Sequence, residues 1–359
     1  MSIRIIHAAD LHLDPPFEGL PPEKAAQRRA ELRRLPAQLA VAARRRQADI
    51  LLLAGDIFDG TRVYPETGEA FADALADLGI PVFIAPGNHD FYSLRSPWAR
   101  LKLPENVHMF ISPRLECAAL DTLGVRVWGA GYDAASCPGL LRDFRPEKVG
   151  GVLDILVLHA EVGRPGSPYC PVTVEELERS GFDYAALGHV HTCSGLRRAG
   201  ECCYAWPGCP AGRGFDECGP KGVLFVELSA EECSASFLPL GQREYRTLTV
   251  DAGADIAAAL PAEAAEHIYR ITLTGECEQA PDPEAIRAGL SPLVYDPTLI
   301  DETRPAEDLW AHLEDDTLRG VFLRRMRSRL NAARGDERDT VLAAARLGLA
   351  ALEGREGPL

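Results

Sequence analysis

Five short motifs in this chain carry side chains of the kinds that bind divalent metal ions. In chain order they are Asp-x-His, Gly-Asp-x-x-Asp, Gly-Asn-His-Asp, a single His after an apolar run, and Gly-His-x-His. A lone histidine at a strand end is usually a hydrogen-bonded structural residue, so the argument depends on all five motifs occurring together. The metal ligands predicted from them are Asp10, His12, Asp56, Asn88, His159, His189 and His191.

This set of ligands suits a pair of divalent ions. Two ions about 4 Å apart need a bridging carboxylate, and we expect Asp56 to be the bridge. The remaining ligands offer imidazole nitrogen and oxygen without a thiolate, a set that manganese, iron and zinc accept. We expect two manganese ions, with iron or zinc as alternatives. Such ions lower the pKa of a bound water towards about 7 and so supply a hydroxide for in-line attack on phosphorus.

Two neighbouring residues are predicted to be catalytic. His89 follows the ligand Asn88, so it should lie beside the metals without binding them. We expect it to protonate the leaving oxygen or to stabilise the charge of the transition state, while Asp90 holds its ring in one tautomer. The alternative is a structural His89. Asp59 either orients a ligand or caps a turn.

Apolar runs of strand length lead into all five motifs, at residues 3–8, 50–54, 81–85, 153–158 and 184–187. Between the first three runs, residues 22–48 have helical periodicity with either a kink or a restart at Pro36, and residues 66–78 form a helix that Gly79 ends. The pattern predicts an α/β fold in which the motifs follow the carboxyl ends of strands, where such sheets bind ligands. Gly55, Gly87 and Gly188 should let the backbone turn sharply there.

The pattern changes after Gly241. Strands are expected at residues 245–250, 269–274 and 293–295, with a helix at 283–289. From Ala306 onward the sequence predicts helix throughout, first to Leu330 and again over residues 337–352. We therefore predict a catalytic domain at residues 1–240, and an accessory α/β capping module with C-terminal helices at 241–359.

The composition is that of a globular protein, with 46% hydrophobic and 25% charged residues among 359. No apolar stretch has the length of a membrane span, and the first residues lack the features of a signal peptide, so a cytoplasmic protein is expected. Five of the ten cysteines fall between Cys193 and Cys218. Their irregular spacing favours reduced structural thiols over a zinc or iron-sulfur site.

Taken together, the five motifs resemble the calcineurin-like metallophosphoesterase superfamily. The resemblance implies a two-sheet sandwich flanked by helices, whereas periodicity alone also allows a single doubly wound sheet. It also implies how the ligands divide between the ions. One ion would be bound by Asp10, His12, Asp56 and His191, and the other by Asp56, Asn88, His159 and His189.

Within that superfamily, residues 1–240 look most similar to the SbcD-like DNA-repair exonucleases, particularly the bacterial YhaO-like branch. The similarity is carried by Ile-His-Ala-Ala-Asp-Leu-His-Leu-Asp at 6–14, and by the segments 55–59, 181–191 and 206–222. It implies a DNA substrate, cut as an exonuclease or endonuclease, and an SMC-like coiled-coil ATPase partner that docks on the helices of 306–352. A self-packed helical pair is the alternative for those helices, and a homodimer is left open.

Two other functions are kept open. A formal net charge of −15 differs from that of a stand-alone DNA-binding protein, and Cys209 stands where such nucleases often have a polar residue. A phosphatase or nucleotide pyrophosphatase with a small substrate would tolerate this charge better. A non-catalytic metal-binding scaffold is expected to lose ligands, and none is missing here.

Overall fold

The computed structural model describes residues 2–241, 243–277, 279–305, 309–335 and 337–354. The chain divides into two compact units. The first consists of Met1–Thr247 together with the short returns Ala262–Arg270 and Val294–Asp296. The second consists of Leu248–Pro261, Ile271–Leu293 and Pro297–Leu359.

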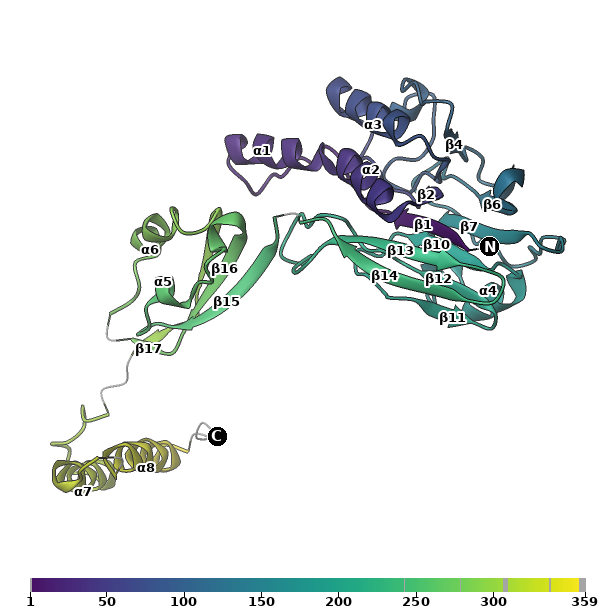
Figure 1. Cartoon of the computed structure of the whole chain (residues 1–359). Coiled ribbons are helices and arrows are strands. Elements are labelled where there is room, and N and C mark those ends of the chain that lie inside the picture. The colour runs from purple at the N-terminus through teal and green to yellow at the C-terminus, as the bar shows by residue number, and fades with distance from the viewer. Residues whose placement is uncertain (1, 242, 278, 306–308, 336, 355–359) are drawn as a thin grey trace. The chain divides into compact units, whose positions relative to one another are not determined.

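Two six-stranded sheets form the first unit (Figure 1). The first sheet has the order β14-β13-β1-β2-β3-β4. Its strands are β1 (Ile3–Ala8), β2 (Ile50–Leu53), β3 (Val82–Ile84), β4 (Val107–Met109), β13 (Gly222–Leu228) and β14 (Cys233–Pro239). The second has the order β11-β12-β10-β7-β6-β5. Its strands are β5 (Glu116–Leu120), β6 (Val125–Gly129), β7 (Leu153–His159), β10 (Tyr184–Gly188), β11 (Arg197–Ala199) and β12 (Cys202–Ala205). The predicted two-sheet α/β sandwich is therefore confirmed.

Alternate residues of the central strands serve two different cores. In β2, Leu51 and Leu53 pack with residues of the helical layer, whereas Ile50 and Leu52 pack with residues of the second sheet such as Ile155. Successive side chains of a strand point to opposite faces, so burying both faces requires an unbroken apolar run. This is why the motif-bearing strands were recognisable in the sequence.

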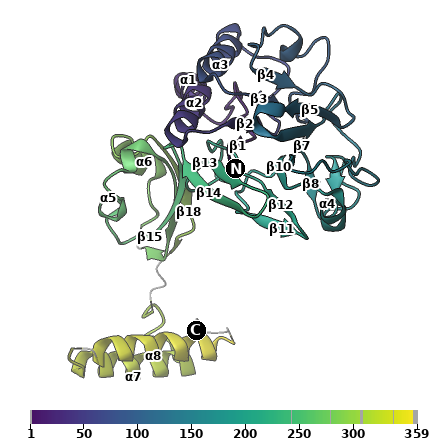
Figure 2. The same cartoon turned by 45° about the vertical axis from the view of Figure 1, so that its right-hand side comes forward.

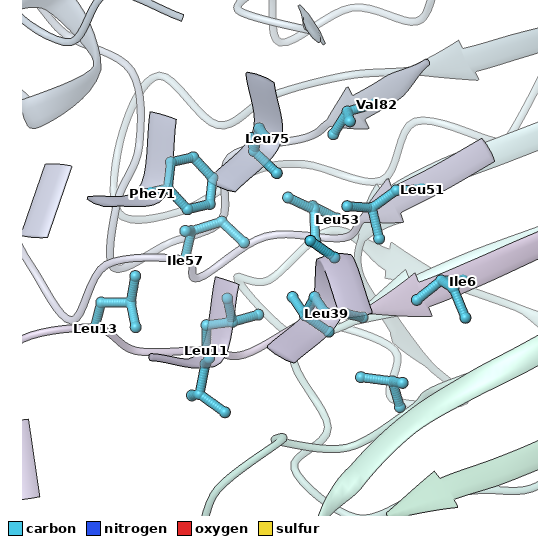
Figure 3. Packing of buried hydrophobic residues seen from close by; sticks show 14 of the residues in the cluster. Ile6, Leu11, Leu13, Leu39, Leu51, Leu53, Ile57, Phe71, Leu75 and Val82 are labelled. Atoms are coloured by element: carbon cyan, nitrogen blue, oxygen red, sulfur yellow. The ribbon is translucent and has the colours of Figure 1, made fainter. Parts of the chain in front are cut away.

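Helices cover the outer face of the first sheet, where Leu39, Phe71 and Leu75 pack against Leu51 and Leu53 (Figure 3). The helices of the first unit are α1 (Pro22–Leu32), α2 (Leu35–Arg46), α3 (Pro65–Leu78) and α4 (Val174–Ser180). Pro36 lies in the first turn of α2, where its missing N–H costs no helical hydrogen bond. Of the kink and the restart that the sequence allowed there, the structure has the restart, because α1 ends at Leu32 and α2 begins at Leu35. Gly79, at φ 72°, ends α3 as expected.

A three-stranded sheet follows β14 in the chain, with the strand order β15-β16-β18. Its strands are β15 (Tyr245–Asp251), β16 (Ile268–Thr274) and β18 (Asp296–Asp301). Two helices accompany it, α5 (Ile256–Ala259) and α6 (Pro283–Leu290). The strand predicted at 293–295 was wrong. Those residues close the end of α6, since the Leu293 amide donates to the carbonyl of Leu290, and the strand begins at Asp296.

The last part of the second unit is a helical pair, α7 (Leu318–Ala332) and α8 (Glu337–Leu352), which lie side by side (Figure 2). Residues 306–308 of the predicted helix lie outside the described residues. The prediction was wrong for residues 309–317, which form turns and bends before Thr317 caps α7 at the amide of Gly320. Among the described residues, no helix is long and apolar enough to cross a membrane.

Candidate active site

The predicted ligands lie where strands of both sheets end. Asp10 follows β1, Asp56 follows β2, and His159 is the last residue of β7. β1 and β2 run parallel in one sheet, as β7 and β10 do in the other, so their carboxyl ends share an edge. Three groups of side chains have possible ligand atoms within 4.8 Å of one another, namely Asp10-His12-His191, His12-Asp56-His89 and Asp10-Asp56-His159.

Several of these residues have an unusual backbone. Asp10, His12, Asp56 and His189 have left-handed φ angles of 54°, 43°, 51° and 94°. This conformation costs a residue other than glycine about 1 kcal/mol or more, and it persists only where the surrounding structure enforces it. The two-residue spacing of Asp10 and His12 therefore brings both side chains to the site through tight turns.

Glycines let the motif loops approach one another closely. A Cβ atom on Gly87 would lie 2.3 Å from Oδ1 of Asp56, and one on Gly188 would lie 1.7 Å from the carbonyl oxygen of Ala54. Gly55 has φ 91°, which glycine adopts without strain. The expected sharp turn thus applies to Gly55, whereas Gly87 and Gly188 are needed because no side chain fits there.

Three imidazoles are held by their outer nitrogen. Nδ1 of His12 lies 2.9 Å from Oδ1 of Asp59, Nδ1 of His159 lies 2.9 Å from the carbonyl oxygen of Ala54, and Nδ1 of His191 lies 2.6 Å from Oε1 of Glu217. Each oxygen accepts the Nδ1 proton, which leaves Nε2 as a lone pair for a metal. Of the two roles left open for Asp59, orienting a ligand fits this contact.

The inner nitrogens converge. Nε2 of His12 lies 3.2 Å from Nε2 of His191, and Nε2 of His159 lies 3.1 Å from Oδ1 of Asn88. Facing lone pairs repel, and a cation between or beside them removes the repulsion. The donors are nitrogen and oxygen, and no cysteine belongs to the three groups found within the described part of the chain. The residues present therefore fit a centre for two divalent ions.

The charge of the site also favours cations. Burial lowers the pKa of His159, but the negative charge of Asp56 and its contact with the ring outweigh burial and raise the pKa to about 9. Burial raises the pKa of Asp56, but the charges of His159 and His12 outweigh it and hold the pKa below its usual range. Metal binding would displace the imidazole proton, because only neutral imidazole is a ligand.

His89 and Asp90 point in opposite directions. His89 is exposed, its ring centroid is 4.8 Å from that of His12, and its amide donates to Oδ1 of Asp56 at 2.9 Å. Asp90 is buried, and its carboxylate accepts hydrogen bonds from the amides of Gly87 and Ile57 at 2.8 and 2.9 Å. This differs from the expectation that Asp90 holds the ring of His89. Asp90 instead ties the loop after β3 to the loop after β2.

His189 enters the site through its backbone, since its amide donates to Oδ1 of Asp10 at 3.0 Å. Its ring packs against those of Tyr169 and His159, with centroids 4.6 and 5.2 Å away. Its side chain is not in the three groups found among the described residues. The position of the His189 ring is therefore set by packing against aromatic rings and not by contacts with the other predicted ligand atoms.

Sequence reasoning missed Arg213 and Glu217. Nη1 of Arg213 lies 2.8 Å from Oδ1 of Asp59, and its Nη2 lies 3.1 Å from Oε1 of Glu217. One guanidinium thereby joins the two carboxylates that orient His12 and His191. Both residues lie in the segment 206–222 that carried part of the resemblance, where an Arg and a Glu four residues apart among glycines were the available signal.

Comparison with known proteins agrees with this geometry. Residues 3–193, more than half of the chain, match the family model of the calcineurin-like phosphoesterases. The chain belongs to this family. The predicted superfamily is therefore confirmed, and the calcineurin-like phosphoesterase fold accounts for the ligands that gather at the edge of two sheets.

Relatives of this phosphoesterase include the metallophosphoesterase YhaO of Bacillus subtilis, 33% identical over 270 residues that make up 72% of this chain and 64% of YhaO. The DNA double-strand break repair protein Mre11 of Aeropyrum pernix is 25% identical over 268 residues, 70% of this chain and 64% of that protein. The SbcD component of the SbcCD nuclease of Rhodobacter capsulatus is 33% identical over 132 residues, 35% of this chain and 27% of that component. The chain thus matches less than two thirds of each relative, and the resemblance to the SbcD-like and YhaO-like branch is confirmed.

Proposed function

We propose that this phosphoesterase is a two-metal phosphodiesterase that cleaves DNA in repair. The observation that carries the proposal is the convergence of Nε2 atoms and carboxylates from five strand ends, three of the imidazoles being locked through Nδ1. The DNA substrate is supported by the names of two relatives, a DNA double-strand break repair protein and a component of a nuclease. Repair inside the cell would match the cytoplasmic location expected from the sequence.

We assign the metal ligands as the resemblance implies, with Asp56 as the bridge and manganese as the preferred ion. Two bound ions would polarise the phosphoryl oxygens and activate a water for attack. The chain supplies the geometry. Asp59 holds His12 in one tautomer, and Glu217 does the same for His191. The carboxylate of Asp10 accepts a hydrogen bond from the amide of His189.

His89 is the proposed catalytic histidine. Its amide is tied to the bridging carboxylate of Asp56, and its side chain is exposed beside the ring of His12. An imidazole in that place can donate a proton to the leaving oxygen, a contribution of roughly 10² to 10⁴ in rate. Asp90 acts by positioning, since it fixes the loop on which His89 lies.

A hollow of about 610 Å³ next to the site could accept the nucleic-acid strand. Its lining includes Asp14 and Asp59, the latter the partner of His12, together with Arg29, Arg62 and Tyr64. Arg62 and Tyr64 are exposed. Cationic groups with an exposed aromatic ring are what a phosphodiester chain and its bases bind, and here the two arginines balance the two carboxylates of the lining.

We assign residues 1–240 to catalysis and residues 241–359 to an accessory role in docking an SMC-like coiled-coil ATPase. The two helices contact each other, and Leu323, Met326 and Leu349 are buried. The pair nevertheless leaves Leu318 and Val321 of α7 exposed at 72% and 51%. An apolar helix face of this kind suits a partner helix. Such a partner would also supply a basic surface.

The test is cleavage of end-labelled duplex DNA by the purified chain with manganese. It is run beside a generic phosphomonoester and beside Asp56→Ala. Manganese-dependent shortening of DNA that Asp56→Ala abolishes supports the nuclease. Turnover of the monoester with intact DNA would instead favour the small-substrate phosphatase, the function that the net charge of −15 suits better.

A further inference from the structure

Two cysteines of the first unit lie in contact. The amide of Cys137 donates to the carbonyl of Pro168 at 2.8 Å, and the amide of Cys170 donates to the carbonyl of Cys137 at 2.8 Å. Both cysteines also belong to one buried cluster, although the Cys137 thiol itself donates to the carbonyl of Pro138 at 3.4 Å. A Cβ atom on Gly139 would lie 2.6 Å from the carbonyl oxygen of Pro171, so the two segments are pressed together. Backbones this close are compatible with the roughly 4.4–6.8 Å between Cα atoms that a disulfide spans.

The two sulfurs are chemically unequal. The hydrogen bond from Cys170 lowers the pKa of the Cys137 thiol, and the same contact together with burial raises the pKa of Cys170. Cys137 is therefore the nucleophile of the pair, because the thiolate is the form that oxidants attack. Cys137 directly follows the exposed residues 133–136 in the sequence, whereas Cys170 is 0% exposed.

Two tyrosines connect this pair with the proposed metal ligands. Tyr169 precedes Cys170, and its ring centroid is 4.6 Å from that of His189. The ring centroid of Tyr132 is 5.7 Å from that of His159. Burial, with the nearby thiols of Cys170 and Cys137, raises the pKa of Tyr132 well above its usual value. A movement of the thiols can therefore reach the imidazoles of His159 and His189 through one tyrosine ring each.

We propose that Cys137 and Cys170 form a reversible disulfide when the protein meets a peroxide, and that this bond weakens metal binding at the centre. The first part stands on the paired backbones and the shared burial of the two cysteines, whereas the second rests on the proposed function. Bond formation brings the two sulfurs to about 2.0 Å from each other. That movement shifts Cys170 and the neighbouring Tyr169. The ring of His189 packs against Tyr169, so its position should change as well.

The chemistry has two steps. The Cys137 thiolate attacks one oxygen of the peroxide, forming an S–O bond while the O–O bond breaks and hydroxide leaves, so sulfur is oxidised and peroxide reduced. The Cys170 thiol then gives up its proton and its sulfur attacks the sulfenic sulfur of Cys137. An S–S bond forms and the S–O bond breaks with release of water. Two thiols and one hydrogen peroxide thus give one disulfide and two waters, and a dithiol reductant reverses the change.

Cys203 and Cys233 provide an internal comparison. These two cysteines share the core between the two sheets, and burial raises the pKa of Cys233. The exposed Cys117 is not part of either pair. Peroxide should therefore join Cys137 to Cys170 in preference to the core pair, and Cys117→Ser should not affect the reaction.

The test uses the full-length protein with manganese, treated with hydrogen peroxide and digested without reduction. We expect a peptide that links Cys137 to Cys170, two hydrogens lighter than the free peptides, and roughly tenfold weaker manganese binding by titration. Dithiothreitol should restore both. Cys137→Ser should keep manganese binding under peroxide, as should Cys170→Ala if the first variant does not fold, whereas Cys117→Ser should behave as wild type.

Absence of the linked peptide, with the two thiols instead oxidised separately, overturns the proposal. Equal loss of manganese in Cys137→Ser and wild type overturns its second part. A linked peptide in a protein that binds manganese but leaves DNA intact would sustain the disulfide and reject the nuclease, so the two failures are distinguishable.

Discussion

Nδ1 of His191 lies 2.6 Å from Oε1 of Glu217, a residue 26 positions further along the chain. Burial raises the pKa of Glu217, but the hydrogen bond with His191 and the charge of Arg213 outweigh it and keep the carboxylate ionised. An ionised Glu217 accepts the Nδ1 proton of His191 and leaves Nε2 free for a metal. Glu217 is therefore a positioning residue for the proposed centre.

Glu217→Gln should weaken manganese binding by about 10- to 100-fold, because the amide no longer favours one imidazole tautomer. Calorimetric titration with manganese measures the effect, and circular dichroism checks that the fold is intact. Glu231→Gln is the matched control, since Glu231 is exposed in the turn before β14. Equal affinities of Glu217→Gln and Glu231→Gln would show that this contact does not orient a ligand.

His89→Ala and Asp56→Ala should separate catalysis from metal binding. His89 is exposed and contributes its backbone amide to Asp56, so removing its ring should retain the metals and lower turnover roughly 10²- to 10⁴-fold. Asp56→Ala removes the proposed bridge and should lose metal as well. Metal content and DNA cleavage are measured on the same samples. Cleavage at the wild-type rate by His89→Ala would falsify the assignment of the catalytic histidine.

The sequence predicted those parts of the fold that are buried on both faces. β2 and β7 are buried throughout, so they appear as unbroken apolar runs. β5 and β14 leave most of their residues exposed or half-buried without regular alternation, which gave no clear pattern. The two sheets of the sandwich followed only from the family resemblance, since local periodicity says nothing about which strands pair.

The site was predictable to the level of residue types but not of side-chain directions. The order of the motifs was enough to predict that Asp10, His12 and His191 lie close together, as they do in the structure. It did not reveal that Asp90 turns inward to backbone amides while His89 turns outward, because adjacent residues in an irregular loop can face either way. Nor could it connect Arg213 with Asp59, which are joined only by the tertiary structure.

Gly87→Ala should damage the site through sterics. The added Cβ would lie 2.3 Å from Oδ1 of Asp56 and 2.8 Å from its backbone nitrogen, and the backbone cannot move aside cheaply. We expect a loss of about 1–3 kcal/mol in the free energy of unfolding, together with weaker manganese binding. Urea denaturation and metal titration measure the two effects. Gly150→Ala, which adds a Cβ with no atom within 4 Å, should change neither; similar behaviour of both variants would contradict the close approach.

The buried His7 should make stability depend on pH. Its Nδ1 accepts from the hydroxyl of Tyr184 at 2.8 Å, its Nε2 donates to the carbonyl of Leu187 at 3.2 Å, and burial lowers its pKa to about 3. The unfolded chain takes up this proton near pH 6.5. Between those values the unfolded state binds more protons, so stability is complete above pH 6.5 and falls as the pH decreases, by up to about 1.4 kcal/mol per pH unit.

His7→Gln cannot titrate, so the stability difference between wild type and this variant isolates the effect of His7 from that of the proposed metal ligands, which are the same in both proteins. Urea unfolding in a metal chelator, at intervals from pH 8 to pH 4, measures that difference. We expect it to be constant above pH 7 and to shift steadily against the wild type below pH 6.5, because only the wild type must keep a neutral imidazole in its core. Parallel stability curves over the whole range would mean that His7 is accessible to protons in the folded state.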